Sequence, residues 1–319
     1  MKALLAGLLC AASISAFAQA PGRPVTIVVP VGPGGGTDLL ARELAKKLAE
    51  AWGQSVVVEN KSGAAGLVGA QSVIRSNADG NTLLFTHDGV ITATPVLYKR
   101  PDFDPGKQLL PLTLVATVPY MAVVHPSVPA KNIAELIAFI KQKNARKETF
   151  GFATSALGSA DHLTGEQFRL DTGVDMLIVP YKSAAPAMMD VIAGHLSLGF
   201  FTIVSTQPHI KAGTLRAIGI TSRERSKLFP DVQTVAETLP GFTGGTWYGL
   251  FAPAGTPGAT VEKLSADIRR VAGSPEMASY MLGNGFEAAT STPAEFVEFI
   301  RKDSARVAEV IRRANVRVE

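Results

Sequence analysis

The chain has 319 residues, of which 46% are hydrophobic and 18% are charged, and its formal net charge is +4. This length and apolar content suffice for one or two domains with filled cores. So small a charge excess, with no basic stripe interleaved with aromatic residues, argues against a nucleic-acid-binding protein, and no block of like charge indicates a disordered tail.

The N-terminus has the composition of a secretory signal peptide. One lysine precedes an apolar run, and a small-residue site follows at 16–18. This order predicts that residues 1–18 are a signal peptide, cleaved before Gln19, and that the mature protein is exported. The apolar run is shorter than a membrane span requires. Cleavage removes Cys10, the only cysteine, and so excludes a cysteine nucleophile or a cysteine-ligated metal from the mature chain.

Short apolar runs alternate with helical patterns, which is typical of an α/β fold with mostly parallel sheets. The first strand is predicted at 24–30. A helix follows it, which we expect Thr37 or Asp38 to cap and Gly53 to end. Further strands are predicted within 54–63, 81–87, 175–181, 196–201, 215–222 and 246–257, and further helices within 65–77, 132–143, 185–195, 258–273 and 293–314. Residues 148–173 have the pattern of a strand, a loop and a helix.

The predicted elements form two similar units, each opening on a strand-to-helix loop rich in Gly, Ser and Thr. This repetition indicates two lobes that face a cleft. Crossings between them near His125 and near Gly245 make the first domain discontinuous. We therefore expect domain 1 to comprise residues 19–124 and 246–319, and domain 2 to comprise residues 125–245.

Three consecutive glycines, followed by Thr-Asp, open the first predicted helix. Glycine lets the backbone approach a ligand closely, and a helix start offers unpaired N–H groups at the positive end of the dipole. No P-loop lysine follows, and Leu39 replaces the third glycine of a dinucleotide fingerprint. A carboxylate site therefore fits better than a nucleotide site, and a tight turn without a ligand is the structural alternative. The expected ligand-binding residues are Gly34, Gly35, Gly36, Thr37 and Asp38; Asp38 is interpreted as a helix cap that orders water, not as a direct partner.

A second loop of the same kind opens the corresponding helix of the second unit. Thr154, Ser155 and Ser159 offer hydroxyl donors, and Gly158 permits close approach of the backbone. We expect the helix to begin near Ala160. Two helix starts in opposite lobes can hold an anionic ligand between them.

The second loop also carries the pattern of a possible secreted hydrolase. His162 and Glu166 share a helix face, one turn after Ser159. However, Ser159 lacks the G-x-S-x-G context of a nucleophile elbow, and two such residues are too few for a metal site. We therefore expect no enzyme, no metal and no cofactor, and interpret His162 as a helix-start residue.

Two further positions lie where the cleft is expected. Thr86 and His87 end a predicted strand there, so both are candidates for ligand contact, and a buried structural role is the alternative for His87. Lys182 follows another strand. It either attracts anions to the cleft or is a solvated lysine.

A resemblance to a known family extends over essentially the whole mature chain. In order, it rests on RPVTIVVPVGPGGGTDLLAR, VVVENKSGAAGLVGA, FTHDGVITATPVLY, GFATSALGSADHLTGEQF, VPYKSAAPAMMD, LRAIGITSRERSKLFPDVQTVAE and WYGLFAPAGTP. These segments resemble the solute receptors of tripartite tricarboxylate transporters, the Bug family of periplasmic binding proteins. The resemblance implies a type II-like fold, with two Rossmann-like α/β lobes joined by two crossover strands that close on a small carboxylate.

The same resemblance implies where the ligand binds and where it goes. The loops at 34–38 and 154–159 correspond to those that hold one carboxylate in the family, partly through ordered water. The closed receptor delivers its cargo to a small and a large membrane subunit, or signals to a sensor protein. The expected location is the periplasm.

Two departures from the family pattern bear on the ligand. Members usually carry Phe-Pro where this chain has Val31-Gly32, and often Phe-Asp-Asn where it has Phe200-Phe201-Thr202. The missing aspartate removes an acceptor for a ligand ammonium or hydroxyl group, and Phe201 offers an apolar surface instead. We therefore expect a monomeric receptor for a less polar carboxylate, aromatic or short and aliphatic, with Phe201 and Thr202 at the site.

Overall fold

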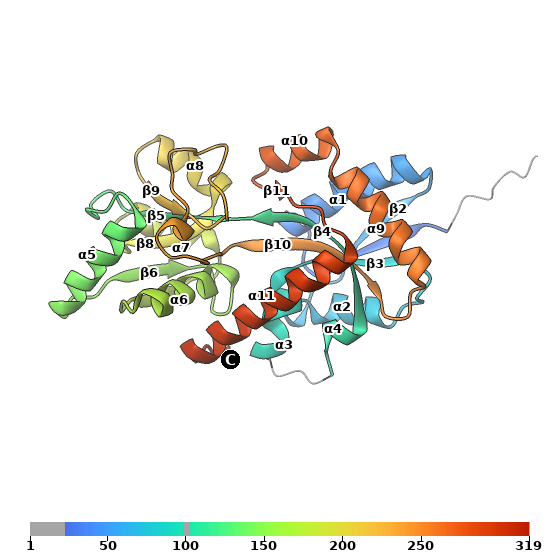
Figure 1. The fold of residues 1–319 in the computed structure, drawn as a ribbon, viewed down its shortest axis with the longest axis horizontal. Coiled ribbons are helices and arrows are strands. Elements are labelled where there is room, and N and C mark those ends of the chain that lie inside the picture. The colour runs from blue at the N-terminus through green and yellow to red at the C-terminus, as the bar shows by residue number, and fades with distance from the viewer. Residues whose placement is uncertain (1–22, 99–101, 319) are drawn as a thin grey trace, which may run out of the picture.

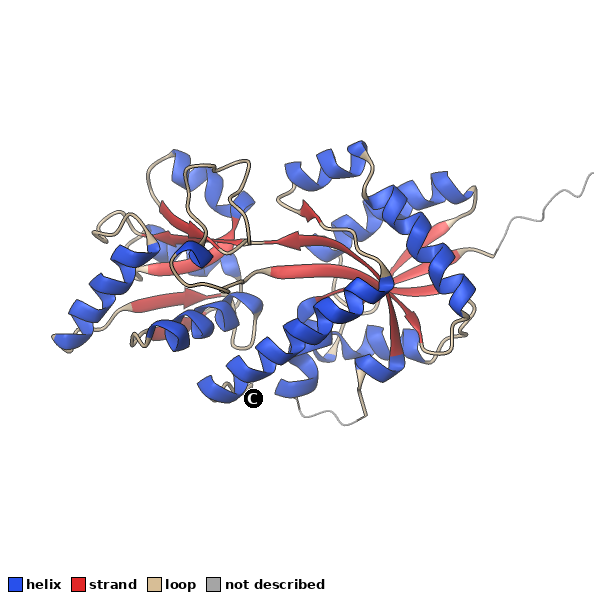
Figure 2. Cartoon of the chain, in the orientation of Figure 1, coloured by secondary structure: helices blue, strands red, loops and turns tan. Residues whose placement is uncertain are grey.

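The computed structural model describes residues 23–98 and 102–318, so the predicted signal peptide and its cleavage point lie outside the described residues. The chain forms two α/β lobes, each built on one sheet (Figures 1 and 2). Across the described ranges, no helix combines the length and the apolar character needed to cross a membrane.

The first lobe is built on a six-stranded sheet in the order β11-β4-β10-β3-β1-β2. The first three strands of the chain pair in parallel, so their carboxyl ends share one edge, and β10 pairs antiparallel with both β3 and β4. The strands are β1 (Val25–Val29), β2 (Val56–Asn60), β3 (Thr82–His87), β4 (Leu109–Val118), β10 (Thr246–Pro253) and β11 (Glu287–Ala288).

Helices cover both faces of this sheet. Leu40, Leu44 and Leu48 of α1 are fully buried at helical spacing, and Gly53 ends α1 in the left-handed conformation, as predicted. The helical segments are α1 (Gly36–Trp52), η1 (Ala64–Gly66), α2 (Leu67–Ile74), η2 (Gly89–Ala93), α3 (Thr94–Leu97), α4 (Pro105–Gln108), α9 (Gly258–Ala272), α10 (Pro275–Gly283) and α11 (Pro293–Ala314).

The second lobe repeats the plan with five strands in the order β7-β6-β8-β5-β9. Its strands are β5 (Tyr120–Val124), β6 (Gly151–Thr154), β7 (Leu177–Pro180), β8 (Leu198–Thr202) and β9 (Arg216–Ile220). Its helical segments are α5 (Ile133–Ala145), α6 (Ala160–Thr172), α7 (Ala184–Ile192), α8 (Ile203–Lys211) and η3 (Val235–Glu237).

The chain passes from the first sheet to the second at Pro119 and returns at Gly245. Gly245 has a φ of +115°, and a Cβ there would lie 2.4 Å from the carbonyl oxygen of Val118, so the two crossings lie against each other. Tyr120–Val124, which the sequence-based division places in domain 1, pairs within the second sheet instead. The first crossing thus precedes His125 by one strand.

Helix α11 braces the two lobes. Near its start, Phe296 packs edge-on against Trp247 of the first lobe, with ring centroids 5.4 Å apart. Near its end, Val307 and Val310 share an apolar cluster with Leu163 of α6, in the second lobe. Figure 1 shows this red helix running from the first lobe toward α6.

Candidate ligand-binding site

Asp38, in the first turn of α1, fastens the first loop (residues 31–38) to its helix. The Oδ2 atom accepts hydrogen bonds from the Gly34 N–H at 2.9 Å and from Nε of Arg42 at 3.0 Å. The Oδ1 atom accepts one from Nδ2 of Asn60 at 2.9 Å, and the same amide donates to the Val31 carbonyl at 3.1 Å. With its side chain 3% exposed, Asp38 holds the loop in shape.

The environment of Asp38 keeps it ionised. Burial raises the pKa of its carboxyl, but hydrogen bonds from Arg42, Gly34 and Asn60 outweigh burial and hold the pKa below its ordinary value. The prediction that Thr37 or Asp38 caps the helix is wrong. Gly35 is the N-cap and provides no side-chain hydrogen bond, because the loop places glycine at that position.

The start of α1 leaves backbone donors without partners in the helix. Because α1 begins at Gly36, the N–H groups of Gly36 and Thr37 have no partner within the helix. The Thr37 side chain hydrogen-bonds with the hydroxyl of Tyr248. A Cβ at Gly36 would lie 3.4 Å from that hydroxyl oxygen and 3.5 Å from Cζ of Phe286, so glycine leaves this corner open.

Asp161 does the same for the second loop (residues 154–161). The Oδ2 atom accepts hydrogen bonds from the Ser155 N–H at 2.6 Å and from Oγ1 of Thr154 at 2.8 Å, and Oδ1 accepts one from Oγ of Ser155 at 2.6 Å. Asp161 is buried at 6% exposure. Two of the three hydroxyls predicted to donate to a ligand, those of Thr154 and Ser155, therefore donate to Asp161.

The rest of the second loop is also tied internally. Ser159 caps α6: Oγ accepts from the His162 N–H at 3.4 Å and donates to the Ala156 carbonyl at 2.6 Å. Gly158, at φ +78°, donates its N–H to Nδ1 of His162 at 3.0 Å. The predicted helix start at Ala160 is confirmed.

The ends of the strands bring a buried acid and two tyrosines together between the loops. Asp88 directly follows β3, is 5% exposed and accepts a hydrogen bond from Oγ1 of Thr246. Burial raises the pKa of Tyr120 well above its ordinary value, and the charges of Asp161 and Asp88 raise it further. Burial and then Asp88 raise the pKa of Tyr248 in the same direction. We call Asp88, Tyr120, Thr246 and Tyr248 the cleft floor.

The cleft floor connects the two loops. Tyr248 hydrogen-bonds with Thr37 of the first loop and lies in the field of Asp88. Tyr120, in the second lobe, lies in the fields of both Asp88 and Asp161. Both strand-to-helix loops thus lie near the same group of side chains.

Of the other predicted contacts, three lie at strand ends. His87 accepts the Gly89 N–H on Nδ1 at 3.1 Å, and its side chain is 30% exposed. Thr86 is fully buried, and within the described residues its hydroxyl has no hydrogen-bond partner. Thr202 caps α8, accepting the Ser205 N–H at 3.4 Å.

Phe201 lies in the core of the second lobe and not on the cleft surface. It is 2% exposed and shares an apolar cluster with Val191 and Ile203, while its neighbour Phe200 points into the cluster on the opposite face of the sheet. The expectation that Phe201 presents a stacking surface to the ligand fails because helices cover both faces of this sheet.

Sequence reasoning missed the residues that organise the site. Asp161 was detectable, because it occupies the first turn of α6 as Asp38 occupies that of α1. Asp88, Tyr120 and Tyr248 carried no local signal, since only the tertiary fold brings them together. In the described part of the chain, no group of three or more His, Cys, Asp or Glu residues could hold a metal ion.

Residues 40–316 match the model of the tripartite tricarboxylate transporter family receptor. The chain belongs to this family. BugT of Bordetella pertussis is 34% identical, over 94% of this chain and 91% of BugT. The fold is similar to that of the periplasmic binding protein BugD, at 35% identity and a TM-score of 0.72, covering 94% of this chain and 100% of BugD.

Two solved structures of similar fold hold carboxylates. R. palustris Rpa4515, solved with adipate, is 32% identical with a TM-score of 0.76, over 93% of this chain and 99% of Rpa4515. MatC of Rhodopseudomonas palustris, with bound malate, is 29% identical with a TM-score of 0.70, over 92% of this chain and 100% of MatC. The matched family is one of receptors, and BugD is a periplasmic binding protein.

The receptor does not assemble a serine hydrolase relay from Ser159, His162 and Glu166. Nδ1 of His162 accepts the Gly158 N–H, and Nε2 lies 3.8 Å from Oε1 of Glu166. Among the described residues, no hydrogen bond joins the His162 ring to the Ser159 hydroxyl. Burial also lowers the pKa of His162, and Arg169 holds the Glu166 carboxylate at 2.7 Å.

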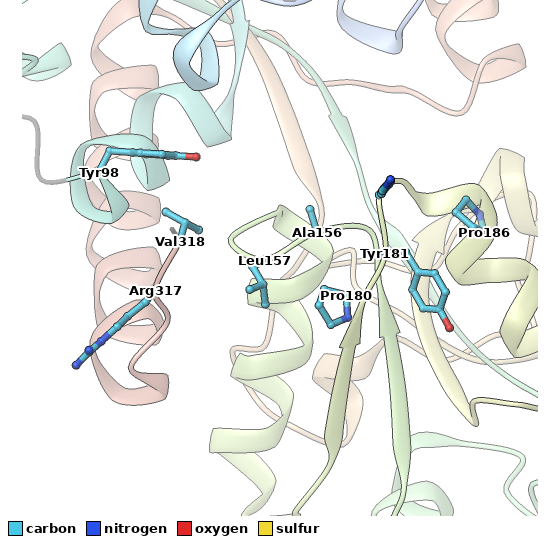
Figure 3. Close-up of a pocket in the computed structure, with 9 residues that line it drawn as sticks. Tyr98, Ala156, Leu157, Pro180, Tyr181, Pro186, Arg317 and Val318 are labelled. Atoms are coloured by element: carbon cyan, nitrogen blue, oxygen red, sulfur yellow. The ribbon is translucent and has the colours of Figure 1, made fainter.

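A groove of about 880 Å³ lies between the lobes beside the second loop. Figure 3 shows Tyr98, Arg317 and Val318 on one side of it and Ala156, Leu157 and Pro180 on the other. Tyr181, Lys182 and Pro186 complete the lining. The predicted ligand loop therefore borders an open, largely apolar space.

Proposed function

We propose that this protein is a periplasmic, non-enzymatic receptor that captures a small organic carboxylate between its lobes. The observation that carries the proposal is the pairing of the two loops. In each lobe, a buried aspartate in the first helical turn accepts a loop N–H, and both loops lie near the cleft floor. This arrangement presents two rigid helix starts to one anion.

The donors to the ligand differ from those first expected. The N–H groups of Gly34 and Gly158 and the hydroxyls of Thr154 and Ser155 have partners within their own loop or in the first turn of the helix that follows it. We assign donation to the N–H groups at the helix starts, which have no partners within their helices. These are Gly35, Gly36 and Thr37 in the first lobe and Ala160 and Asp161 in the second. The residues that are already hydrogen-bonded within the loops hold these N–H groups in position.

Binding in this scheme favours closure of the lobes. A ligand that contacts both helix starts stabilises the closed conformer over the open one, and this difference in affinity shifts the population. The two crossings lie against each other, which supports rotation about one narrow hinge. Such closure needs no second copy, so we propose a monomer that presents cargo to the small and large membrane subunits of a transporter, or to a sensor.

The ligand class rests on relatives and on the lining of the groove. Rpa4515 holds adipate and MatC holds malate, which supports a carboxylate. We further propose a less polar or aromatic acid. Leu157, Pro180 and Tyr98 in the groove support this proposal. Phe201 does not, because it is buried. Export with cleavage before Gln19 is proposed from the N-terminal pattern.

A panel of acids tests the proposal on the mature protein. Benzoate, hexanoate, adipate, malate, citrate and aspartate are compared by thermal shift and calorimetric titration. At 100 times its Kd, a ligand stabilises the fold by about 2.7 kcal/mol and raises Tm. Benzamide and hexanamide, which lack the carboxylate, serve as controls and should give no shift.

Three outcomes would contradict parts of the proposal. If the protein binds none of these acids, the assignment as a carboxylate receptor is wrong. Tight binding of citrate or aspartate without benzoate or hexanoate retains the receptor but removes the less polar ligand. Turnover of ester or amide substrates would restore the hydrolase alternative.

A further inference from the structure

We infer that the groove beside the second loop holds the apolar or aromatic body of the ligand, and that Val318, near the C-terminus, limits its size. The inference rests on the proposed function, because it assigns the far part of the same ligand. It makes the C-terminal segment (residues 315–318) part of the binding site.

The sequence directs this segment back toward the cleft. Asn315 ends α11 in the left-handed conformation, at φ 51°. The Val316 N–H then donates to the Ile311 carbonyl at 3.0 Å, which reverses the chain. Val316 packs against the apolar cluster that joins α11 to Leu163 of α6. The segment is thereby anchored where the two lobes meet.

The C-terminal segment contacts the loop that holds the second helix start. A Cβ at Gly158 would lie 3.1 Å from Cγ1 of Val318 and 2.8 Å from Cδ1 of Leu97. Gly158 also has a φ of +78°, which disfavours other residues. The second loop therefore packs closely against both the first lobe and Val318.

The walls of the groove fit an apolar body. Tyr98 and Leu157 lie on opposite sides of it, with exposures of 44% and 48%. Exposed apolar side chains that face each other across a recess are typical of ligand pockets. The hydroxyl of Tyr181 is occupied by Asp190, so this tyrosine presents no free polar end to the groove.

The charge of the groove fits an anion. Lys182 and Arg317 line it, and no acidic residue does so among the described residues. Figure 3 shows the Arg317 side chain running away from Leu157, so Lys182 is the groove cation that attracts an anionic ligand toward the cleft. Over residues 23–98 and 102–318, Lys182 has no ion-pair partner. An apolar or aromatic carboxylate complements both the walls and the charge.

Filling the groove tests this assignment. Val318→Trp places a large ring against Tyr98 and Leu157. The matched control is Val297→Trp, a substitution of the same kind on α11 at a position that is 51% exposed and outside the groove. Propionate, hexanoate and benzoate are titrated calorimetrically into both variants and the wild type, and Tm without ligand is measured for each.

Val318→Trp should lower the affinity for benzoate and for hexanoate by at least about tenfold, and should leave the affinity for propionate unchanged. Val297→Trp should change none of the three. A merely structural role for Val318 would lower Tm and weaken all three acids alike, which would overturn the inference. If the wild type binds benzoate and Val318→Trp does not change this affinity, the groove assignment is overturned but the proposal of a carboxylate receptor is retained. A wild type that binds none of the acids overturns both.

Discussion

In the first lobe, Asp38 holds the loop and pairs with the charged side chain of Arg42. In the second lobe, Asp161 accepts hydrogen bonds from two hydroxyls and a backbone N–H. The difference follows from the loops themselves. Half of the residues in the first loop are glycine, and the side-chain donors to Asp38 come from Arg42, one turn along α1, and from Asn60 on β2. The second loop supplies its own donors. The same backbone shape is thus set by tertiary contacts in one lobe and by local sequence in the other.

The largest expected effect comes from removing either aspartate. Asp161→Ala leaves three donors unpaired in a buried site and should lower the free energy of unfolding by about 3 kcal/mol. Asp38→Ala should cost about 2 kcal/mol, because Arg42 is 49% exposed and can be hydrated instead. Urea unfolding measures both, and Asp171→Ala, at an exposed position of α6, is the control. If Asp38→Ala lowers the free energy of unfolding by more than Asp161→Ala does, the expected order of the two lobes is wrong.

Substitutions at the two serines of the second loop compare two contributions to stability: the hydrogen bond to Asp161 within the loop, and the cap of α6. Ser155→Ala removes the hydroxyl donor to Oδ1 of Asp161 and should cost about 1–2 kcal/mol. Ser159→Ala removes the cap of α6 and should cost about 1 kcal/mol. Chemical denaturation gives both values. If neither substitution changes stability, the second loop does not depend on its own side chains.

The smallest effect, and one confined to the first lobe, is expected from Arg42→Gln. The folded-state pKa of Asp38 lies below its unfolded value of about 3.9, so its contribution is present above that pH and is lost as pH falls through the folded pKa. Without Arg42, burial raises this pKa, and the variant should lose at most about 1 kcal/mol at pH 7.

Unfolding curves from pH 3 to pH 7 check this prediction. The gap in stability between Arg42→Gln and the wild type should narrow as pH falls through the folded pKa values of Asp38, because the variant, with the higher pKa, is protonated and stabilised first. A gap that stays constant with pH would show that Arg42 acts through packing and not through the charge of Asp38.

Local patterns predicted the elements that carry strong local signals. The strand before the glycines, helix α1 and its end at Gly53 follow from apolar spacing and a glycine stop. Strand β4 was not predicted, since Pro111 interrupts it and its pairing with β10 is irregular there. Helix α10 is short and buries only Met277 and Met281. Neither element has a periodic pattern long enough to detect.

The site could be predicted as two loops but not as a set of donors. Glycine and hydroxyl residues marked both loops correctly, yet a hydroxyl in a list of residues does not show whether it donates to a ligand or to its own loop. The Ser155 hydroxyl donates to Asp161, because the fold of the loop brings the two side chains together. Phe201 illustrates the same limit, because burial of both faces of β8 depends on helices distant in sequence.

The position of β10 sets the order in which the lobes can be completed. All strands of the second sheet lie between residues 120 and 220, whereas β10, at the centre of the first sheet between β3 and β4, begins at residue 246. During synthesis, the second sheet therefore has every strand available while the first still lacks the one that joins its two halves. Domains usually form in the order in which they are made. If this protein follows that order, the lobe that begins the chain is completed last.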